Sequence, residues 1–518
     1  MRLMKSRYLL STLLCVGAAS GSACAQEQET GPLQPLGEGV VAAAESIDTA
    51  DYLRKLWVIA HDSMGGRDTP SPGLEMTAAW IASEFERVGL TPAGDDGSYV
   101  QRYSIETVQS DLVASTVTVN GQGDLRVGRD LLIDGTSEGD FEGEVVLLVG
   151  RGERSPEVIS SIVGKHVIVA STAGRLDRTG GGRSFVTDLR RDGALSIWVV
   201  TDADELAWSQ RVERRSGRGA IRLGGGSIET GLSVSVRDRA IRPILSAHGV
   251  DLGQVPGQEA AYVVDVPGLA LTLSPRVQVL QSLSAPNVAG ILEGSDPVLR
   301  DEYVVFSAHM DHIGIGSPNA EGDSINNGAD DDGSGTTAVL EIAEAYASLA
   351  TRPKRSMIFL LVSGEEKGLW GSAYFAANPP VPVDDMVADL NIDMVGRNWP
   401  DTIVAIGMEH SDLGATLKQV NEAHPELGMT AIDDLWPNER FYFRSDHYNF
   451  AQKGVPVLFF FNGTHEDYHG RNDEVDRIDA EKAVRITQLI FYLGYELASR
   501  PERPRWNPES RREIVLDR

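Results

Sequence analysis

The C-terminal half of the chain alternates continuous apolar runs with amphipathic segments. The runs are continuous enough for strands that are buried on both faces, as in a parallel or mixed sheet. They lie at residues 303–308, 357–362, 387–392 and 455–461. Apolar side chains at helical spacing predict helices among and after them, most clearly over residues 336–349 and 480–497. Strands that alternate with helices predict an α/β domain, a three-layer sandwich with a mixed, mainly parallel sheet.

Residues 48–90 also show helical periodicity. Met76, Trp80 and Phe85 are among the apolar positions that recur at three- and four-residue steps, and Gly89 is expected to end the helix. A turn-rich loop follows, and then an extended segment at residues 99–105.

Residues 108–275 have a different sequence pattern, in which short runs typical of β-strands are separated by turns and glycine clusters. The runs lie at residues 112–119, 143–149, 166–170 and 197–201. The glycine triplets at 180–182 and 224–226 are not phosphate-binding loops, because neither a Walker lysine nor a G-x-G-x-x-G register accompanies them. We interpret this segment as an inserted β-rich domain. The expected bounds are 26–107 and 276–505 for the two parts of the α/β domain, 108–275 for the insert and 506–518 for a polar C-terminal tail.

The N-terminus is typical of a secretory signal peptide, residues 1–25. Basic residues precede an apolar run at 8–19 that is too short to span a bilayer. Ala23-Cys24-Ala25 fits an A-x-A cleavage site, and we favour simple cleavage over the alternative, a lipoprotein anchored through Cys24. This predicts export to the periplasm or the extracellular space. Because the chain's two cysteines, Cys15 and Cys24, both lie in this segment, the mature protein is expected to have no disulfide.

Charge and hydropathy exclude two classes of partner. The 518 residues include 47 lysines and arginines against 75 aspartates and glutamates, a formal net charge of −28. Such a balance repels a phosphate backbone, so we expect no nucleic-acid partner. After the signal segment the chain has no apolar stretch of about 18 residues, so no transmembrane helix is expected either.

Acidic and histidine side chains gather where the apolar runs of the α/β domain end. The ligands of such sheets collect beyond the carboxyl ends of the strands, so these side chains are expected to meet. Imidazoles and carboxylates are zinc ligands, and a two-metal hydrolase site needs one bridging carboxylate and another that accepts a proton from water. The clusters are His309 and Asp311, Asp330 to Asp332, Glu365 and Glu366, Asp393, and Tyr468 and His469.

Each cluster also has a purely structural interpretation. His309 alone would more often be structural, but Asp311 is placed to accept its second ring N–H and so to favour ligation. The three aspartates precede a helix and would complement its dipole. Adjacent glutamates usually face solvent, although here two roles, ligand and general base, are needed from one place. Asp393 ends an apolar strand, where an unpaired carboxylate would be costly.

A further histidine motif lies near the C-terminus. His465-Glu466-Asp467-Tyr468-His469 satisfies H-E-x-x-H, the signature of helical zinc peptidases. Its surroundings have no apolar helical periodicity, so we expect a loop. The motif is then expected to supply one metal ligand, His469, with Tyr468 as a hydrogen-bond donor to developing charge.

These residues resemble the M28 family of zinc aminopeptidases, whose relatives include glutamate carboxypeptidase II. The motifs that carry the resemblance are SAHMDH, NGADDDGSG, SGEEKGLWGS, NIDMVG and DYHGRND, in the family's order between residues 287 and 476. Residues 61–99 are similar to the family's N-terminal region, and by position and texture the insert resembles a protease-associated domain.

The resemblance implies two zinc ions per chain and a role for each residue. Asp331 would bridge the ions, with a cis peptide bond to Asp332, although the extra Asp330 leaves the position of the bridge open by one residue. Glu365 would be the general base that takes a proton from metal-bound water and delivers it to the leaving amine. His309 and Asp393 would complete one zinc, and Glu366 and His469 the other. Outside these ligands, supporting roles fall to Asp446, His447 and His465.

The resemblance therefore predicts a secreted aminopeptidase that acts on peptides, and three alternatives stay open. A glutaminyl cyclase of this fold binds one zinc and lacks the first histidine, so His309 argues against it. A carboxypeptidase of the same fold would bind a terminal carboxylate instead of an α-ammonium. A non-catalytic, receptor-like ectodomain would have lost ligands that this chain retains.

Substrate choice is less well indicated. Four aromatic residues could line an apolar specificity pocket or simply pack, and Arg444 could bind a substrate carboxylate or pair with Asp446. The four are Trp436, Phe441, Tyr442 and Phe443. The sequence does not indicate an oligomeric state.

Overall fold

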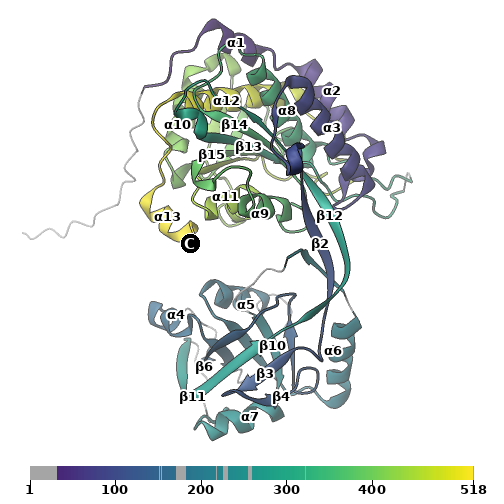
Figure 1. The fold of residues 1–518 in the computed structure, drawn as a ribbon, viewed down its shortest axis with the longest axis vertical. Helices are drawn as coiled ribbons and strands as arrows, with labels where there is room; N and C mark the ends of the chain where they lie inside the picture. Colours follow the sequence, from purple (N-terminus) through teal and green to yellow (C-terminus); the bar gives the residue numbers. More distant parts are fainter. Residues whose placement is uncertain are drawn as a thin grey trace, which may run out of the picture.

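Two β-sheets, joined by a long ribbon of strands, organise the chain in a computed structural model (Figure 1). The structure describes residues 32–150, 152, 154–170, 182–217, 219–225, 232–254, 260–320 and 322–516. The predicted signal peptide and both cysteines lie outside these residues, so their prediction stays as it is. None of the described helices is both long and apolar enough to cross a lipid bilayer.

The larger sheet has ten strands in the order β17-β16-β18-β15-β13-β14-β12-β2-β9, with β1 beside β12. Its four central strands, β18, β15, β13 and β14, run parallel, and antiparallel strands flank them on both sides. The sheet is therefore mixed, as predicted. Its strands are β1 (Thr91–Pro92), β2 (Val100–Ser110), β9 (Ala220–Leu223), β12 (Val277–Leu292), β13 (Tyr303–His309), β14 (Ser356–Val362), β15 (Met386–Ile392), β16 (Thr402–Ile406), β17 (Thr430–Ile432) and β18 (Val457–Phe460).

Helices cover both faces of this sheet and give the predicted three layers. One hydrophobic core lies between the sheet and six of the helices, and a second core lies on the opposite face. The first group comprises α1 (Glu38–Glu45), α2 (Thr49–Ile59), α3 (Pro72–Val88), α8 (Gly335–Ala347), α10 (Leu413–Ala423) and α12 (Ala480–Ser499). The second comprises α9 (Trp370–Ala377), α11 (His447–Gln452) and α13 (Pro508–Ile514).

Helix α3 illustrates how local sequence sets these elements. The Ser71 hydroxyl caps its start by accepting from Leu74 N, with proline at the first helical position. Gly89 ends it in the left-handed conformation, φ 79°, as predicted from the sequence. The C-terminal segment differs from expectation. It was expected to be a polar tail, but it contains α13, because Ile514 is buried against the sheet.

The smaller sheet is built from the segment between β2 and β12, and it has eight strands in the order β4-β3-β11-β6-β7-β8-β10-β5. Three of the four predicted runs coincide with β6, β7 and β8, and the first is shortened to β3. The strands are β3 (Thr116–Val119), β4 (Gln122–Leu125), β5 (Leu131–Asp134), β6 (Phe141–Val149), β7 (His166–Ala170), β8 (Ser196–Thr201), β10 (Leu232–Arg237) and β11 (Tyr262–Ser274).

This insert also contains helices that its sequence did not suggest. They are α4 (Pro156–Ile162), α5 (Gly182–Arg191), α6 (Glu205–Gly217) and α7 (Asp238–Ala247). In α6 only Trp208 is buried, so the helix has almost no apolar periodicity to detect. The insert is thus an α/β unit rather than a purely β-rich one, and its assignment as a protease-associated domain stays a prediction.

Strands β2 and β12 belong to the larger sheet at one end and extend as an antiparallel ribbon toward the insert at the other (Figure 1). Strand β9, which comes from the insert, pairs with the outer half of β2. We call the part of the chain around the larger sheet the larger lobe and the insert the smaller lobe. Residues 278–284 of β12 are exposed, since neither lobe covers this part of the ribbon.

Candidate metal centre

The parallel strands of the larger sheet bring the predicted clusters to one edge. His309 is the last residue of β13 and pairs in register with Val362, the last residue of β14. Glu365 and Glu366 follow β14, and Asp393 follows β15 on the other side of β13. The remaining carboxylates come from the loop at residues 329–334, which leads into α8. The side chains therefore meet for the reason expected, the shared direction of neighbouring strands.

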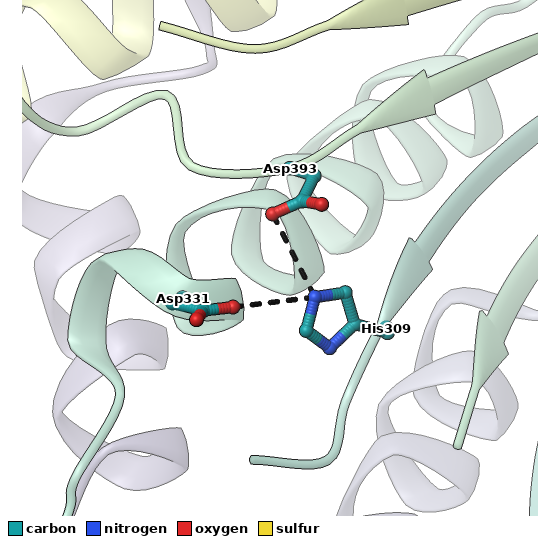
Figure 2. A group of neighbouring side chains, drawn as sticks. All are labelled: His309, Asp331 and Asp393. Atoms are coloured by element: carbon teal, nitrogen blue, oxygen red, sulfur yellow. Dashed lines mark ion pairs between the residues drawn. The ribbon is translucent and has the colours of Figure 1, made fainter. Parts of the chain in front are cut away.

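One group consists of His309, Asp331 and Asp393 (Figure 2). The His309 Nε2 atom lies 3.3 Å from Asp331 Oδ1 and 3.6 Å from Asp393 Oδ1. All three side chains are buried. Burial alone would raise the pKa of Asp331, but the imidazoles of His312, His309 and His469 lower it below its ordinary value. Asp331 is thus held as a carboxylate in the interior.

The second group lies on the other side of Asp331. The Oδ2 atom of Asp331 is 3.2 Å from His469 Nε2, and that nitrogen is also 3.2 Å from Glu366 Oε2. Burial raises the pKa of Glu366, yet His312 and His469 outweigh it and lower the value to about 2. Asp331 therefore presents one oxygen to each group, which is the placement of a bridging carboxylate.

The nitrogen and oxygen atoms of the two groups are placed to bind metal ions rather than to form hydrogen bonds with one another. Among the described residues, His312 Nδ1, Asp331 Oδ2, Glu366 Oε1 and Asp393 Oδ1 are buried without a hydrogen-bond partner. Two ligands of one zinc ion, each bonded at about 2.0–2.2 Å, stand roughly 3 to 3.6 Å apart. Contacts of this length without hydrogen bonds, made by nitrogen and carboxylate oxygen, match the ligand set that zinc prefers.

Asp330 and Asp332 have other partners, which decides between the three adjacent aspartates. Asp330 Oδ1 accepts from Gly396 N at 2.6 Å, and its Oδ2 lies 3.3 Å from His465 Nε2. Asp332 accepts from the backbone N of Gly335 and of His309. The Asp331–Asp332 peptide bond is cis, as predicted. Of the three aspartates only Asp331 faces both groups, so the geometry favours Asp331 for the bridge, and that role stays a prediction.

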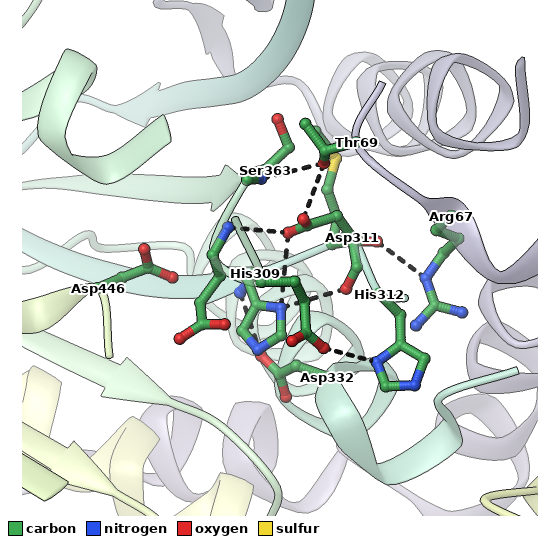
Figure 3. Close-up of polar contacts among 12 residues, drawn as sticks. Arg67, Thr69, His309, Asp311, His312, Asp332, Ser363 and Asp446 are labelled. Atoms are coloured by element: carbon green, nitrogen blue, oxygen red, sulfur yellow. Dashed lines mark hydrogen bonds and ion pairs between the residues drawn. The ribbon is translucent and has the colours of Figure 1, made fainter. Parts of the chain in front are cut away.

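Asp311 holds His309 through its backbone more closely than through its carboxylate (Figure 3). The His309 Nδ1–H donates to the Asp311 carbonyl at 3.2 Å, while the carboxylate Oδ1 is 3.6 Å away. The Asp311 carboxylate instead accepts from the Thr69 hydroxyl at 2.8 Å and from Glu365 N at 3.3 Å. Because Nδ1 carries the proton, the Nε2 lone pair of His309 is left for a ligand role.

Glu365 lies beside the first group without joining either group. Its carboxylate lines a cavity together with His309, Asp331 and Asp393. Burial raises the pKa of Glu365 well above its ordinary value, and neighbouring carboxylates raise it further. A carboxylate with a raised pKa is suited to accept and return a proton.

The H-E-x-x-H segment is a turn rather than a helix, as predicted. Its two histidines contact different carboxylates. His465 contacts Asp330, whereas His469 contacts Asp331 and Glu366. The Tyr468 ring stacks on His469 at 3.9 Å between centroids and lines the cavity. Tyr468 thus lies beside the candidate ligand His469, and its expected role as a hydrogen-bond donor stays a prediction.

Asp446 and His447 lie behind the centre. Asp446 accepts from the Ser372 hydroxyl, and His447 Nε2 donates to the Tyr442 carbonyl at 2.8 Å. Burial lowers the pKa of His447 to about 3, so this imidazole is neutral. Neither residue belongs to the two groups of candidate ligands among the described residues, and their supporting roles stay a prediction.

Of the four aromatic residues at 436–443, only Phe441 lines the cavity. Deeper walls come from Met394, Phe459 and Phe461, which are buried. Arg444 also lines the cavity, where its guanidinium lies over the Phe441 ring at 4.8 Å. The pairing of Arg444 with Asp446 that we considered from the sequence is absent among the described contacts.

Two residues near the centre were missed in the sequence analysis. Arg67 is fully buried and donates to backbone carbonyls of Met310, Asn327 and Gly328, which ties the loop after β13 to the aspartate loop. His312 is fully buried next to Glu366. A second histidine three positions after His309 was the signal that could have identified His312.

Comparisons with known proteins found similarities to peptidases. Residues 287–494 match the model of peptidase family M28. A probable zinc metalloprotease of Pyricularia oryzae is 25% identical over 288 residues, 47% of this chain and 55% of the relative. Aminopeptidase YwaD of Bacillus subtilis is 22% identical over 238 residues, 44% of this chain and 48% of the relative.

The first curated relatives are matched over 55 to 58% of their own length, so the chain spans little more than half of them. Among solved structures, an aminopeptidase from an Aneurinibacillus strain superimposes with a TM-score of 0.47 and 16% identity, covering 90% of this chain and 98% of its own.

Proposed function

We propose that the chain, whose residues 287–494 match the model of peptidase family M28, is a dizinc aminopeptidase that removes N-terminal residues from peptides. The observation that carries the proposal is the position of Asp331, whose two oxygens face two separate groups of ligand atoms. His309 and Asp393 would hold one ion together with Asp331. Glu366 and His469 would hold the other.

Each remaining residue of the centre has a role in this proposal. When bound, the zinc ions supply Lewis-acid chemistry and lower the pKa of water. Glu365 takes a proton from the attacking water and delivers it to the leaving amine. Tyr468 donates a hydrogen bond to the charge that develops on the substrate carbonyl oxygen, and Asp311 keeps the His309 ring in its ligating orientation.

The lining of the cavity supports an aminopeptidase. Glu365, Asp393 and Asp331 line it, and their carboxylates would attract a free α-ammonium group. The apolar walls would receive an uncharged side chain of the first residue. A carboxypeptidase is the second candidate, because Arg444 is the only lysine or arginine among the lining residues and could bind a terminal carboxylate.

A panel of small substrates tests the proposal. We expect hydrolysis of leucine p-nitroanilide and of free dipeptides, loss of that activity after chelation, and recovery with added zinc. N-acetylated dipeptides should be inert. Cleavage of the blocked dipeptides alone would identify a carboxypeptidase, and cyclisation of N-terminal glutamine by a protein with one zinc would identify a glutaminyl cyclase. Retained zinc without turnover of any substrate would indicate a binding ectodomain.

Two matched arginine variants separate the two candidates further. Arg440 makes the same kind of contact as Arg444, with its guanidinium over Phe443 at 4.7 Å, but it does not line the cavity. For an aminopeptidase assayed with leucine p-nitroanilide, Arg444→Leu and Arg440→Leu should give similar KM values. For a carboxypeptidase, Arg444→Leu alone should raise the KM for blocked dipeptides about tenfold or more, because a charge-assisted contact is lost.

A further inference from the structure

His312 makes contacts that the five predicted ligands do not explain. It follows β13 by three residues, and its side chain is 0% exposed. Its Nδ1 atom lies 2.9 Å from Glu366 Oε1 and 3.6 Å from Asp331 Oδ2. These are the same two carboxylates that His469 contacts from the other side. Two imidazoles therefore converge on one pair of carboxylates.

The contact between His312 and Glu366 is short, but it is not a hydrogen bond. Among the described residues, both His312 Nδ1 and Glu366 Oε1 lack a hydrogen-bond partner although they are only 2.9 Å apart. Two ligands of one ion stand in this relation, because each lone pair points at the ion and not at the neighbouring ligand. His309 and His469 stand in the same relation to their carboxylates, at 3.2 to 3.6 Å.

The backbone around His312 fixes this position of the ring. His312 N donates to the carbonyl of Arg67, whose side chain Figure 3 shows near His312. The Arg67 guanidinium donates in turn to the carbonyls of Met310 and Gly328. Gly328 lies directly against the ring, since a Cβ there would stand 2.6 Å from His312 Cγ and Cδ2. A side chain held this firmly does not need to rearrange before it binds an ion.

We propose that His312 is a third imidazole ligand of the dizinc centre and binds, through Nδ1, the ion shared by Glu366 and His469. This inference rests on the proposed function. The two sites then differ. One ion has a single imidazole and two carboxylates, whereas the other has two imidazoles and two carboxylates. The second site should bind zinc more tightly and fill first, even though His469 is 37% exposed.

The imidazole count of the zinc-loaded protein tests the inference directly. X-ray absorption of the wild-type holoprotein should give three imidazoles for two ions, and His312→Asn should give two. His465→Asn is the matched control, since His465 is also buried in this region but contacts Asp330 instead of the ligand atoms. The control should keep all three. Metal affinity alone would not decide, because losing a residue that only positions a ligand can cost about 10- to 100-fold.

A cysteine variant gives a second, positive readout if His312→Asn folds poorly. In His312→Cys loaded with cobalt(II), a thiolate ligand should produce a near-ultraviolet charge-transfer band. The chain's own cysteines, Cys15 and Cys24, are the same in both proteins and would be removed by the expected cleavage, so the wild-type spectrum is the baseline. Stepwise zinc titration of the wild type should show one tighter site, and in His312→Asn the tighter site should weaken at least about tenfold.

The outcomes separate this inference from the function on which it rests. An unchanged imidazole count in His312→Asn, together with no thiolate band in His312→Cys, would overturn the ligand role of His312 while two bound ions upheld the dizinc site. A wild-type protein that binds fewer than two ions would instead overturn the proposed function itself.

Discussion

Each of the two lobes buries a histidine on a parallel strand, and the two differ in what surrounds them. In the insert, His166 on β7 donates through Nε2 to the Leu271 carbonyl at 3.0 Å, and its Nδ1 lies 2.7 Å from the Ser196 hydroxyl. Burial lowers the pKa of His166 to about 4, so it is neutral. In the larger sheet, His309 uses only Nδ1 for a hydrogen bond and directs Nε2 at two carboxylates.

Burial of a histidine therefore says little about chemistry until its partners are known. His166 has both ring nitrogens satisfied by neutral groups, and no carboxylate approaches it among the described contacts. Its role is to fill and satisfy the interior of the smaller sheet. His309 keeps a free lone pair beside Asp331 and Asp393, each of which has one buried oxygen without a hydrogen-bond partner among the described residues. Such a deficit is expected where an ion completes the hydrogen bonding and the charge balance.

The largest expected effect comes from Glu365→Gln in the larger lobe. The amide cannot accept and return the proton, so kcat should fall about 10²- to 10⁴-fold, while zinc content and thermal stability stay near wild type. Glu144→Gln on β6 of the insert, a solvent-exposed carboxylate, is the control and should change neither activity nor zinc content. Turnover by Glu365→Gln at the wild-type rate would remove Glu365 from the mechanism.

Substituting the two histidines themselves tests the comparison next. His309→Leu should lose one zinc ion per chain, measured by metal analysis of the purified protein. His166→Leu should keep wild-type zinc content and lower the free energy of unfolding by about 1 to 3 kcal/mol, because it leaves polar partners unsatisfied in the insert. Loss of zinc from His166→Leu would mean that the lobes are coupled in a way that their separate sheets do not suggest.

A smaller effect concerns Asp389, which is buried on β15 below the centre. Burial raises the pKa of Asp389 to about 8, and the carboxylate of Asp446 adds to this, although the Ser307 hydroxyl opposes it. The folded protein thus keeps a proton that the unfolded chain releases near pH 4. Between about pH 4 and pH 8 the free energy of unfolding therefore falls by about 1.4 kcal/mol per pH unit as the pH rises.

Asp389→Asn should remove that pH dependence. From pH 5 to pH 8 the free energy of unfolding of the variant should therefore rise relative to that of the wild type with each pH unit. Asp130→Asn in the insert is the control. The guanidinium of Arg129 and the backbone N–H of Arg126 outweigh burial and lower the pKa of Asp130, so its contribution changes only at more acidic pH. The Asp130→Asn curve should stay parallel to wild type over this range, and parallel curves for Asp389→Asn would contradict the raised pKa.

Much of the larger lobe follows from sequence patterns. The apolar runs give β13, β14, β15 and β18, and the parallel direction of these strands explains why His309, Glu366 and Asp393 meet. Sequence spacing could not choose Asp331 over Asp330, because the choice depends on long-range contacts of Asp330. Gly396 N donates to Asp330 Oδ1, and His465 Nε2 lies 3.3 Å from Asp330 Oδ2.

The residues that were missed act through long-range packing. Arg67 reaches carbonyls more than 240 positions away, and no local pattern indicates such contacts. The orientation of the His312 ring depends on Gly328 in another loop. In the insert, helix α6 was missed because it buries little apart from Trp208 and so lacks an apolar stripe.

Anomalous diffraction at the zinc edge from crystals of the zinc-loaded protein tests the central claim most directly. We expect two peaks per chain, about 3.5 to 4 Å apart, one beside His309 and Asp393 and the other beside Glu366 and His469. Asp331 should lie between them and contact both. A single peak, or two peaks that do not share Asp331, would contradict the account.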